Sequence, residues 1–280
     1  MKVSAAVTWN RTARAEWDAL TAGADAAYQQ DWAYGEALAG ANPKLKLLRG
    51  RAERSDGSLI AIAQIASRPF AMAANFALCT LGPVWVGAPT DEDKRAAFKA
   101  LGRALPVRWP RLLVATPDEA RAEAGWLSGF SRVMTGDATV LIDLTPDEAA
   151  LRAQLDGKWR NALVKAEKSD LKAERGGSKP AQYRWLLEAE MKQREARGYR
   201  ALPAELTEAW QAGKLKGDGS DKSGGIALYR AELNRQTCAG MLFLVHGRRA
   251  TYHVGWNDEA GRAHAAHNLL LWTAMLDLKT

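Results

Sequence analysis

The clearest chemical feature of the sequence is a basic segment in its second half. Residues 158–200 carry 12 Lys and Arg against 6 Asp and Glu, whereas residues 1–157 carry 18 of each. Nearly all of the net charge of +7 therefore lies in this segment. A localised excess of cations indicates an anionic partner, which on charge alone is a phosphorylated small molecule, a nucleic acid or a membrane surface.

The basic segment opens with GKWRNALVKAEK, a pattern that predicts a helix. Lys158, Asn161 and Lys165 fall on one side of this helix, and Leu163 falls on the inward side. Arg160 lies between the two sides, where its planar guanidinium can bind a phosphate through two hydrogen bonds. These four polar residues are therefore candidate anion ligands. The alternative interpretation is a charged face in contact with water.

All four histidines lie within residues 246–267. His253 follows Tyr252 on a predicted strand, and His264 and His267 are one turn apart at the start of a predicted helix. No cluster of Cys, Asp or Glu accompanies them, so no metal is expected. His253 is a candidate catalytic residue, and the alternative interpretation of the histidines is polar packing.

The first half of the chain alternates predicted helices and strands. Acidic residues 91–93 suit the start of a helix, because the helix dipole is positive there. The predicted elements are helices over 11–22 and 30–40, a hairpin over 45–51 and 58–68, a strand over 76–86, a helix from 91 to 105, and buried strands over 111–115 and 138–144.

The second half shows three strands in quick succession before a final helix. Thr145, Pro146 and Glu148 predict the start of a long helix that reaches Ser169, with Thr145 as its N-cap. The remaining predicted elements are a strand over 171–174, a helix over 180–197 stopped by Gly198, a helix over 203–212, a Gly-rich loop over 213–225, strands over 226–232, 238–245 and 251–255, and a helix over 263–278.

Composition excludes several classes of protein. The 280 residues are 47% hydrophobic, which is enough to bury a core, and the two cysteines are too few for a disulfide framework. No uncharged apolar run reaches the length of a membrane span, and polar residues interrupt the N-terminal apolar run before a signal peptide forms. We therefore expect a cytoplasmic enzyme or binding protein without a transmembrane segment.

Four stretches in order along the chain carry a family resemblance. WRNALVKAEK, AGMLFLVHGRRATYHVGW and HAAHNLLLWTAMLD, with QQDWAYGEAL in the first half, resemble the Fem-type (FemAB-like) aminoacyltransferases and their relatives with a BioF-like acetyltransferase domain, within the GNAT superfamily. The resemblance implies two tandem GNAT-like domains with mixed, mainly antiparallel sheets, here 1–144 and 145–280. The second domain would lack the family's last strand, because the sequence stops at Thr280. If the domain needs that strand, the chain is expected to be truncated.

The resemblance also implies roles for particular residues. Arg160 and Lys165 match basic positions of the family's helix. Tyr252 matches the tyrosine of its Tyr-x-x-Gly strand, where the phenol would bind a phosphate or the reacting carbonyl, so Tyr252 is a candidate catalytic residue. Trp256, which closes that strand, and Trp32, which matches the tryptophan of the family's early helix, are candidate substrate-binding residues. A lysine that binds the acceptor in the family is replaced here by Glu36, so the first domain is expected to recognise its acceptor differently.

A CoA-binding GNAT enzyme carries Arg/Gln-x-x-Gly-x-Gly/Ala at the helix after this strand, because bare backbone amides must meet the pyrophosphate. The aligned residues here are RAHAAH, which begin at Arg262 and lack both glycines. Arg262 is thus a candidate cofactor-binding residue, while tight CoA binding of the usual kind is disfavoured. We expect no tightly bound cofactor and a donor that is aminoacyl-tRNA or acyl-CoA.

The function that these features favour is transfer of an aminoacyl or acyl group onto an amine of a phosphorylated acceptor, such as a cell-wall (peptidoglycan) precursor. One alternative is an acyl-CoA-dependent N-acetyltransferase that acts on another amine. A second is a non-catalytic nucleic-acid-binding protein, although the basic segment lacks the exposed aromatics of RNA readers. Peripheral contact with a membrane is compatible with the charge.

Overall fold

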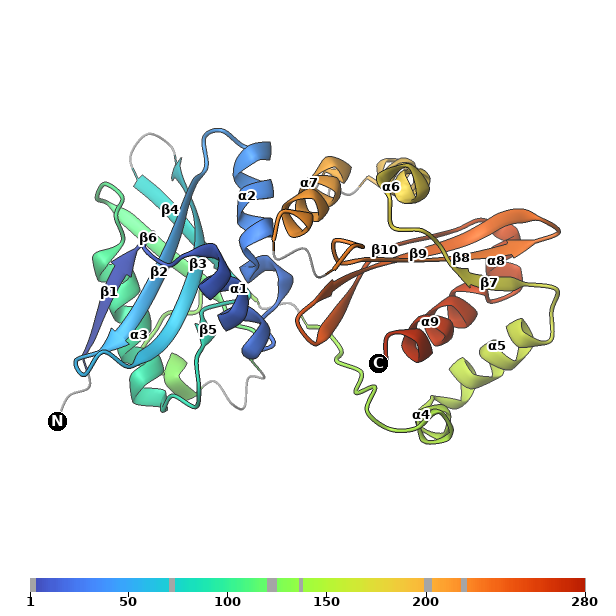
Figure 1. The fold of residues 1–280 in the computed structure, drawn as a ribbon, viewed down its shortest axis with the longest axis horizontal. Coiled ribbons are helices and arrows are strands. Elements are labelled where there is room, and N and C mark those ends of the chain that lie inside the picture. Colours follow the sequence, from blue (N-terminus) through green and yellow to red (C-terminus); the bar gives the residue numbers. More distant parts are fainter. Residues whose placement is uncertain are drawn as a thin grey trace. The chain divides into compact units, whose positions relative to one another are not determined.

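The computed structural model describes residues 4–70, 74–119, 125–135, 138–198, 203–217 and 221–279. The chain divides into two compact units, each built around one sheet (Figure 1). Unit 1 comprises Met1–Asp137 with Ala212–Ser220 and His246–Arg249, and unit 2 comprises Ala138–Gln211, Asp221–Val245 and Ala250–Thr280. The expected mixed α/β class is confirmed, while the domain boundary after residue 144 stays a prediction.

Unit 1 contains a sheet with the strand order β1-β2-β3-β4-β6, in which β5 pairs with β3. All its pairs are antiparallel except β4 with β6. The elements are β1 (Ala5–Trp9), α1 (Arg14–Gly23), η1 (Tyr28–Gln30), α2 (Trp32–Ala41), β2 (Lys46–Arg54), β3 (Leu59–Phe70), β4 (Ala74–Thr80), β5 (Val84–Trp85), α3 (Asp91–Ala104), β6 (Arg111–Thr116) and η3 (Gly125–Leu127).

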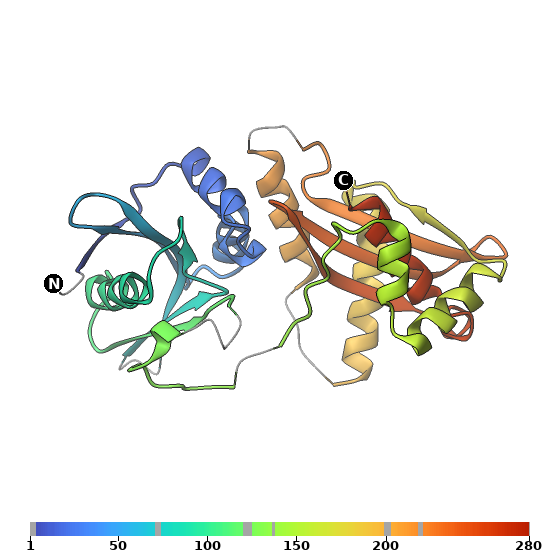
Figure 2. The same cartoon turned by 90° about the horizontal axis from the view of Figure 1, so that it is seen from below.

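The helices of unit 1 cover both faces of its sheet (Figure 2). Helix α3 begins with a complete capping box, in which Thr90 and Asp93 exchange side-chain and backbone hydrogen bonds. Its apolar side, including Leu101, packs against one face of the sheet. Trp17 of α1 packs with Ile62 of β3 on the other face. Here the helices and the hairpin predicted from the sequence are confirmed.

Residues 138–144 do not form the buried strand that the sequence predicts. Val140 and Leu141 are 83% and 71% exposed, and neither sheet includes this segment among its described strands. A strand is stabilised by pairing with its neighbours and by burial of a face, and this segment has neither, so its apolar composition alone does not make it a strand.

Unit 2 contains a sheet with the strand order β10-β9-β8-β7. Strands β7 and β8, and strands β8 and β9, are antiparallel. The elements are α4 (Glu148–Gln154), α5 (Gly157–Glu167), β7 (Lys172–Arg175), α6 (Pro180–Ala196), α7 (Ala204–Leu215), β8 (Ile226–Leu233), β9 (Gln236–His246), β10 (Arg249–Asn257), α8 (Glu259–Ala263) and α9 (Ala266–Asp277).

The long helix predicted from Thr145 to Ser169 is two helices. Asp147, not Thr145, caps α4, and its side chain accepts a hydrogen bond from the N–H of Ala150. The chain leaves the helix at Leu155, and the carboxylate of Asp156 then accepts hydrogen bonds from the N–H groups of Lys158 and Trp159 to start α5. An aspartate that can bond these amides competes with helix continuation, which explains the break.

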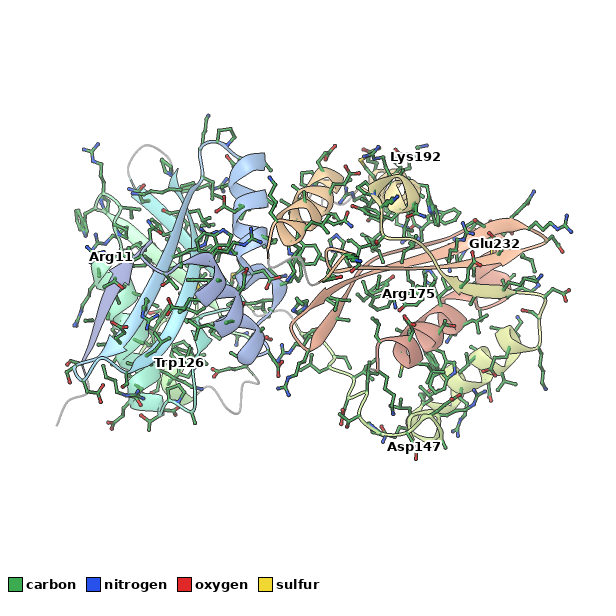
Figure 3. All side chains as sticks on the ribbon, in the orientation of Figure 1. Arg11, Trp126, Asp147, Arg175, Lys192 and Glu232 are labelled. Atoms are coloured by element: carbon green, nitrogen blue, oxygen red, sulfur yellow. The ribbon has the colours of Figure 1, made fainter. Side chains whose placement is uncertain are left out.

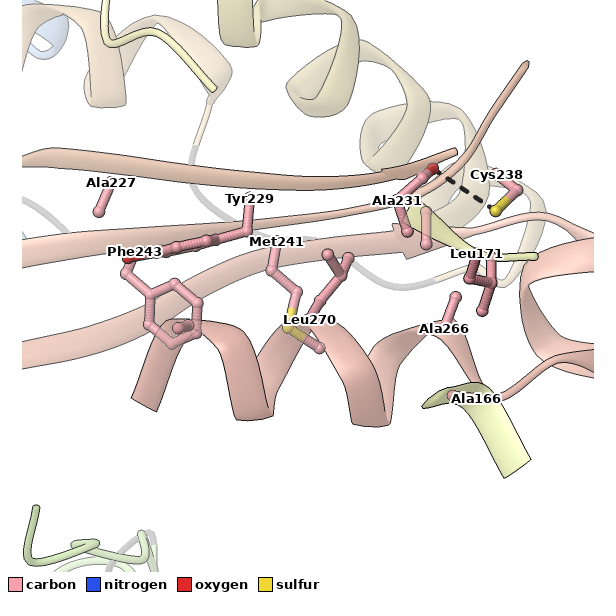
Figure 4. Packing of buried hydrophobic residues seen from close by; sticks show 12 residues of the cluster. Ala166, Leu171, Ala227, Tyr229, Ala231, Cys238, Met241, Phe243, Ala266 and Leu270 are labelled. Atoms are coloured by element: carbon pink, nitrogen blue, oxygen red, sulfur yellow. Dashed lines mark hydrogen bonds between the residues drawn. The ribbon is translucent and has the colours of Figure 1, made fainter. Parts of the chain in front are cut away.

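Helix α9 packs against one face of the unit 2 sheet (Figure 4). Met241, Phe243 and Leu270 belong to the core between them. At its far end, Asp277 accepts hydrogen bonds from Arg175 Nη1 at 2.7 Å and Tyr229 Oη at 2.5 Å (Figure 3 labels Arg175). Helices α6 and α7 lie on the opposite face of this sheet, and α5 packs onto α9 (Figure 1).

The last predicted helix is also interrupted. Helix α8 ends at Ala263, and α9 begins after Ala265, which has the left-handed φ of 55°. Asp258 caps α8 by accepting a hydrogen bond from the N–H of Gly261. Across the described ranges of the chain, none of the helices combines the length and the apolar character that crossing a bilayer requires.

Candidate active site

Strand β10 holds Tyr252 and His253 on opposite faces of the unit 2 sheet. The Tyr252 ring lies 5.6 Å from the ring of Phe243, a member of the core that α9 covers. Nε2 of His253 lies 2.8 Å from Oγ1 of Thr207 on α7. Successive side chains of a strand point to opposite faces, which accounts for the separation. The two candidate catalytic residues therefore do not converge on one point.

The environment of His253 keeps its imidazole neutral. Burial lowers the pKa of His253 to about 4. A neutral imidazole accepts a hydrogen bond on one nitrogen and donates one from the other. His253 is thus suited to position α7 against β10, and Thr207 is the partner that the sequence did not reveal.

The phenol of Tyr252 lies beside the backbone of Gly255. A Cβ atom at Gly255 would clash with the Tyr252 hydroxyl. Tyr252 is 50% exposed, so part of this side chain faces solvent. The Tyr-x-x-Gly spacing therefore has a physical reason here, because the absence of a side chain at the glycine leaves room for the phenol.

Trp256 lies further along β10 and contacts helix α6. Its ring and that of Trp185 form an edge-to-face pair with centroids 6.1 Å apart. Trp185 itself fits over Gly240 of β9, where a Cβ atom would lie 2.6 Å from the indole. Trp256 therefore packs as part of the α6 face, and its ring is in contact with protein.

The turn between α8 and α9 joins the end of β10. Nη1 of Arg262 donates a hydrogen bond of 2.9 Å to the carbonyl oxygen of Asn257, and Nε2 of His267 lies 3.1 Å from the carbonyl oxygen of Trp256. Burial lowers the pKa of His267. Ala265 has the backbone conformation that a glycine adopts readily, in the place of the first glycine of the CoA-binding turn.

The residues present at this turn do not fit the pyrophosphate of CoA in the usual way. His267 stands where that turn has Gly or Ala, and its ring is bound to the strand. Ala266, between the two positions, is fully buried in the core. Backbone amides of a first helical turn bind a phosphate best where glycines leave the space beside them open, and here residues 265 and 267 both carry a Cβ atom.

The basic helix α5 forms a second and separate group. Lys158, Arg160, Asn161 and Lys165 are all exposed, and the apolar side of α5 places Leu163 in a cluster with Trp272 of α9. Among the described residues, none of the four forms an ion pair with an acidic side chain of this chain. Their positive and polar groups are therefore available to an anion on the outer side of α5.

Trp32 lies in unit 1, under a buried arginine. The guanidinium of Arg49 stacks on the indole with its Cζ atom 3.4 Å from the ring centroid, and it donates a hydrogen bond of 2.9 Å to Glu36 Oε1. Arg49 is 8% exposed and also binds Gln64 Oε1 at 3.0 Å. Glu36 thus has a cation as its partner. Arg49 directly follows Leu47 and Leu48 in β2, and this position next to an apolar pair is the sequence signal for a buried arginine.

Comparison with known proteins assigns the second half of the chain. Residues 150–280 match the family model described as an acetyltransferase (GNAT) domain. This region is a GNAT domain. The expectation of an acyltransferase is thereby confirmed. No curated protein matches the chain.

Solved structures extend the comparison to both units of the GNAT-domain protein. The crystal structure of FemX has a TM-score of 0.74 at 12% identity, covering 97% of this chain and 86% of that one. The chain therefore shares the fold of FemX. The C-terminal domain of a proposed lysylphosphatidylglycerol synthetase from Agrobacterium fabrum has a TM-score of 0.44 (10% identity, 95% and 76% coverage). A tandem GNAT protein from the clavulanic acid biosynthesis pathway has a TM-score of 0.41 at 14% identity, covering 97% of this chain and 85% of that one.

Proposed function

We propose that this chain transfers an aminoacyl group from an aminoacyl-tRNA to an amine of a phosphorylated acceptor, of the peptidoglycan-precursor class. The GNAT domain supports acyl transfer, and the observation that favours an aminoacyl donor is the turn at Ala265 to His267. At this turn Ala265 has a left-handed φ of 55°, and Ala265 and His267 stand at the two positions where a CoA-binding turn carries Gly and then Gly or Ala.

The reaction needs little chemistry from the protein. The amine of the acceptor attacks the carbonyl carbon of the aminoacyl ester, an amide bond forms, and the ester oxygen leaves as the terminal hydroxyl of the tRNA. The proton lost by the amine passes to that oxygen. Positioning the two substrates and donating a hydrogen bond to the carbonyl oxygen supply most of the rate enhancement.

Two groups of residues would carry these tasks. The half-exposed phenol of Tyr252 would donate its hydrogen bond to the carbonyl oxygen as negative charge develops there. The exposed cations of α5, above all Arg160 and Lys165, would hold the phosphates of the acceptor. His253 and Trp256 would position β10 against α7 and α6.

A donor competition tests the proposal. The full chain is incubated with an amine acceptor that carries a diphosphate and with either a mixture of aminoacyl-tRNAs or acetyl-CoA, and the products are identified by mass spectrometry. We expect an aminoacylated acceptor and no acetylated one. An acetylated product, together with micromolar binding of acetyl-CoA in calorimetry, would instead identify an acyl-CoA-dependent N-acetyltransferase.

A further inference from the structure

One end of the unit 1 sheet gathers segments that are far apart in the sequence. Lys46 at the start of β2 lies opposite Ser67 near the end of β3. Arg68 lies opposite Phe76 of β4, which in turn lies beside Leu112 of β6. The start of β2, the end of β3 and the starts of β4 and β6 therefore lie at the same end of the sheet.

The turn between α3 and β6 is bound to this end. Nζ of Lys46 donates a hydrogen bond of 2.9 Å to the carbonyl oxygen of Pro106. The side chain and the backbone N–H of Asn75 donate to the carbonyl oxygens of Arg108 and Pro110, at 2.8 and 2.9 Å. These contacts hold the turn beside the strand ends.

This region is strongly basic although unit 1 as a whole is not. Residues 42–50, 65–70, 74–80 and 101–116 contain neither Asp nor Glu. The cations at this end are Lys44, Lys46, Arg68, Arg103, Arg108 and Arg111. The Asp and Glu residues that balance the charge of the first half lie outside these ranges. The fold therefore brings the six cations together at this end of the sheet without acidic residues from the same segments.

The same region exposes large apolar side chains. Trp109 is 82% exposed, Phe70 is 62% exposed and Leu112 is 50% exposed. A side chain of this size left in water is unfavourable unless a partner covers it, and three of them together mark an interaction surface. We call this surface, with its six cations, the basic end of unit 1.

We propose that the basic end of unit 1 docks onto an anionic membrane surface. Tryptophan is enriched at the level of the lipid headgroups, and lysine and arginine are attracted to anionic lipids beside it. Leu112 favours a bilayer over a nucleic acid, because an aliphatic side chain can enter the acyl region but offers no aromatic face for a base. This inference does not depend on the proposed reaction.

Vesicle sedimentation of the full chain tests the inference. The chain is mixed with vesicles of phosphatidylcholine alone or of phosphatidylcholine with phosphatidylglycerol. We expect binding to the anionic vesicles only, and weaker binding as salt is added. The double variant Arg68→Ala and Arg108→Ala should bind about 25-fold more weakly, at about fivefold per cation removed.

The apolar part has its own variants and matched controls. Trp109→Ser with Phe70→Ser should lower binding about tenfold or more, because these side chains would no longer enter the interface. Val140→Ser removes an equally exposed apolar side chain elsewhere, and Lys192→Ala removes a cation of α6 (labelled in Figure 3); both should leave binding unchanged. Urea unfolding of each variant verifies that all of them are folded.

Three results would overturn the inference. One is equal binding to both kinds of vesicle, and another is wild-type binding by both double variants of the basic end. The third is that the chain ignores vesicles but binds single-stranded RNA or dimerises through the same residues, as measured by fluorescence anisotropy and light scattering. In that case the surface is specific for that other partner.

Discussion

His253 Nε2 and Thr207 Oγ1, 2.8 Å apart, join strand β10 to helix α7 on one face of the unit 2 sheet. Tyr252, the preceding residue, lies on the other face against Phe243. Adjacent residues of one strand therefore have different tasks. The histidine joins the strand to a helix, and the tyrosine is half exposed on the other face.

The pKa of His253 predicts how stability depends on pH. Burial lowers the pKa of His253 from its ordinary value of 6.5 to about 4 in the folded chain, so the unfolded chain binds the proton more tightly. The stability that comes from a neutral His253 is complete above pH 6.5 and is lost as the pH falls towards 4, by up to about 3 kcal/mol. His253→Asn should make the free energy of unfolding less dependent on pH in this window.

Urea unfolding at several pH values measures this effect, with His264→Asn as the control at another partly buried histidine. Burial also lowers the pKa of His246 in unit 1 to about 4. The stability of His253→Asn should therefore still depend on pH, although less steeply than that of the wild-type chain. An unchanged slope in His253→Asn would mean that this histidine is charged or solvated in the folded protein.

The contact between Tyr252 and Gly255 predicts a coupled pair of variants. Tyr252→Phe should lower kcat by about 100-fold if the phenol donates to the carbonyl oxygen. Gly255→Ala should lower kcat as well, because the new Cβ atom displaces the Tyr252 hydroxyl. In the Tyr252→Phe background, Gly255→Ala should have little further effect. Additive losses in the double variant would separate the glycine from the tyrosine.

Arg160 on α5 is predicted to bind the phosphates of the acceptor. Arg160→Ala should weaken binding of a diphosphate-bearing acceptor by about 1.5–3 kcal/mol, as expected for loss of a charge-assisted hydrogen bond. Calorimetry measures the affinity, and Lys192→Ala, which removes an exposed cation from α6, is the control. Equal affinities of Arg160→Ala and the wild type would exclude Arg160 from the site.

The turn at Ala265 predicts a gain of CoA binding. Ala265→Gly with His267→Gly restores the two missing glycines and opens the approach to the first turn of α9. We expect acetyl-CoA to bind this double variant at least tenfold more tightly than the wild type in calorimetry. Ala265→Gly alone should be tolerated, since a left-handed alanine costs about 1 kcal/mol. No gain in the double variant would mean that these side chains are not the obstacle.

Much of the fold follows from local signals that act within one turn of the chain. The acidic start of α3 at Asp91 and the stop of α6 at Gly198, which has a φ of 73°, were both readable in this way. The break at Asp156 could also be read locally, but the apolar spacing from Leu151 to Leu163 conceals it. The conformation of residues 138–144 could not be predicted locally. An apolar segment becomes a strand only if a neighbouring strand pairs with it, and the sequence alone does not place that neighbour.

The candidate site was predictable in its residues but not in its geometry. The family resemblance pointed to Tyr252, and residue type and spacing pointed to His253 and Arg160. Only the fold shows that they lie on two faces of a sheet and on the outer side of α5. The stacking of Arg49 on Trp32 and the bond to Glu36 link residues that local periodicity does not connect. Long-range pairs of this kind are set by strand register and helix packing.

Asp156 has a consequence for the anions that α5 can hold. Its carboxylate accepts hydrogen bonds from the N–H groups of Lys158 and Trp159, so the electropositive tip of this helix already carries a negative group. In the proposed function, a phosphate of the acceptor would then be held from the side of the helix by long, flexible side chains such as that of Lys165. Recognition of that kind would depend on the charge of the acceptor more than on its shape. One protein could then accept acceptors that share only their phosphates.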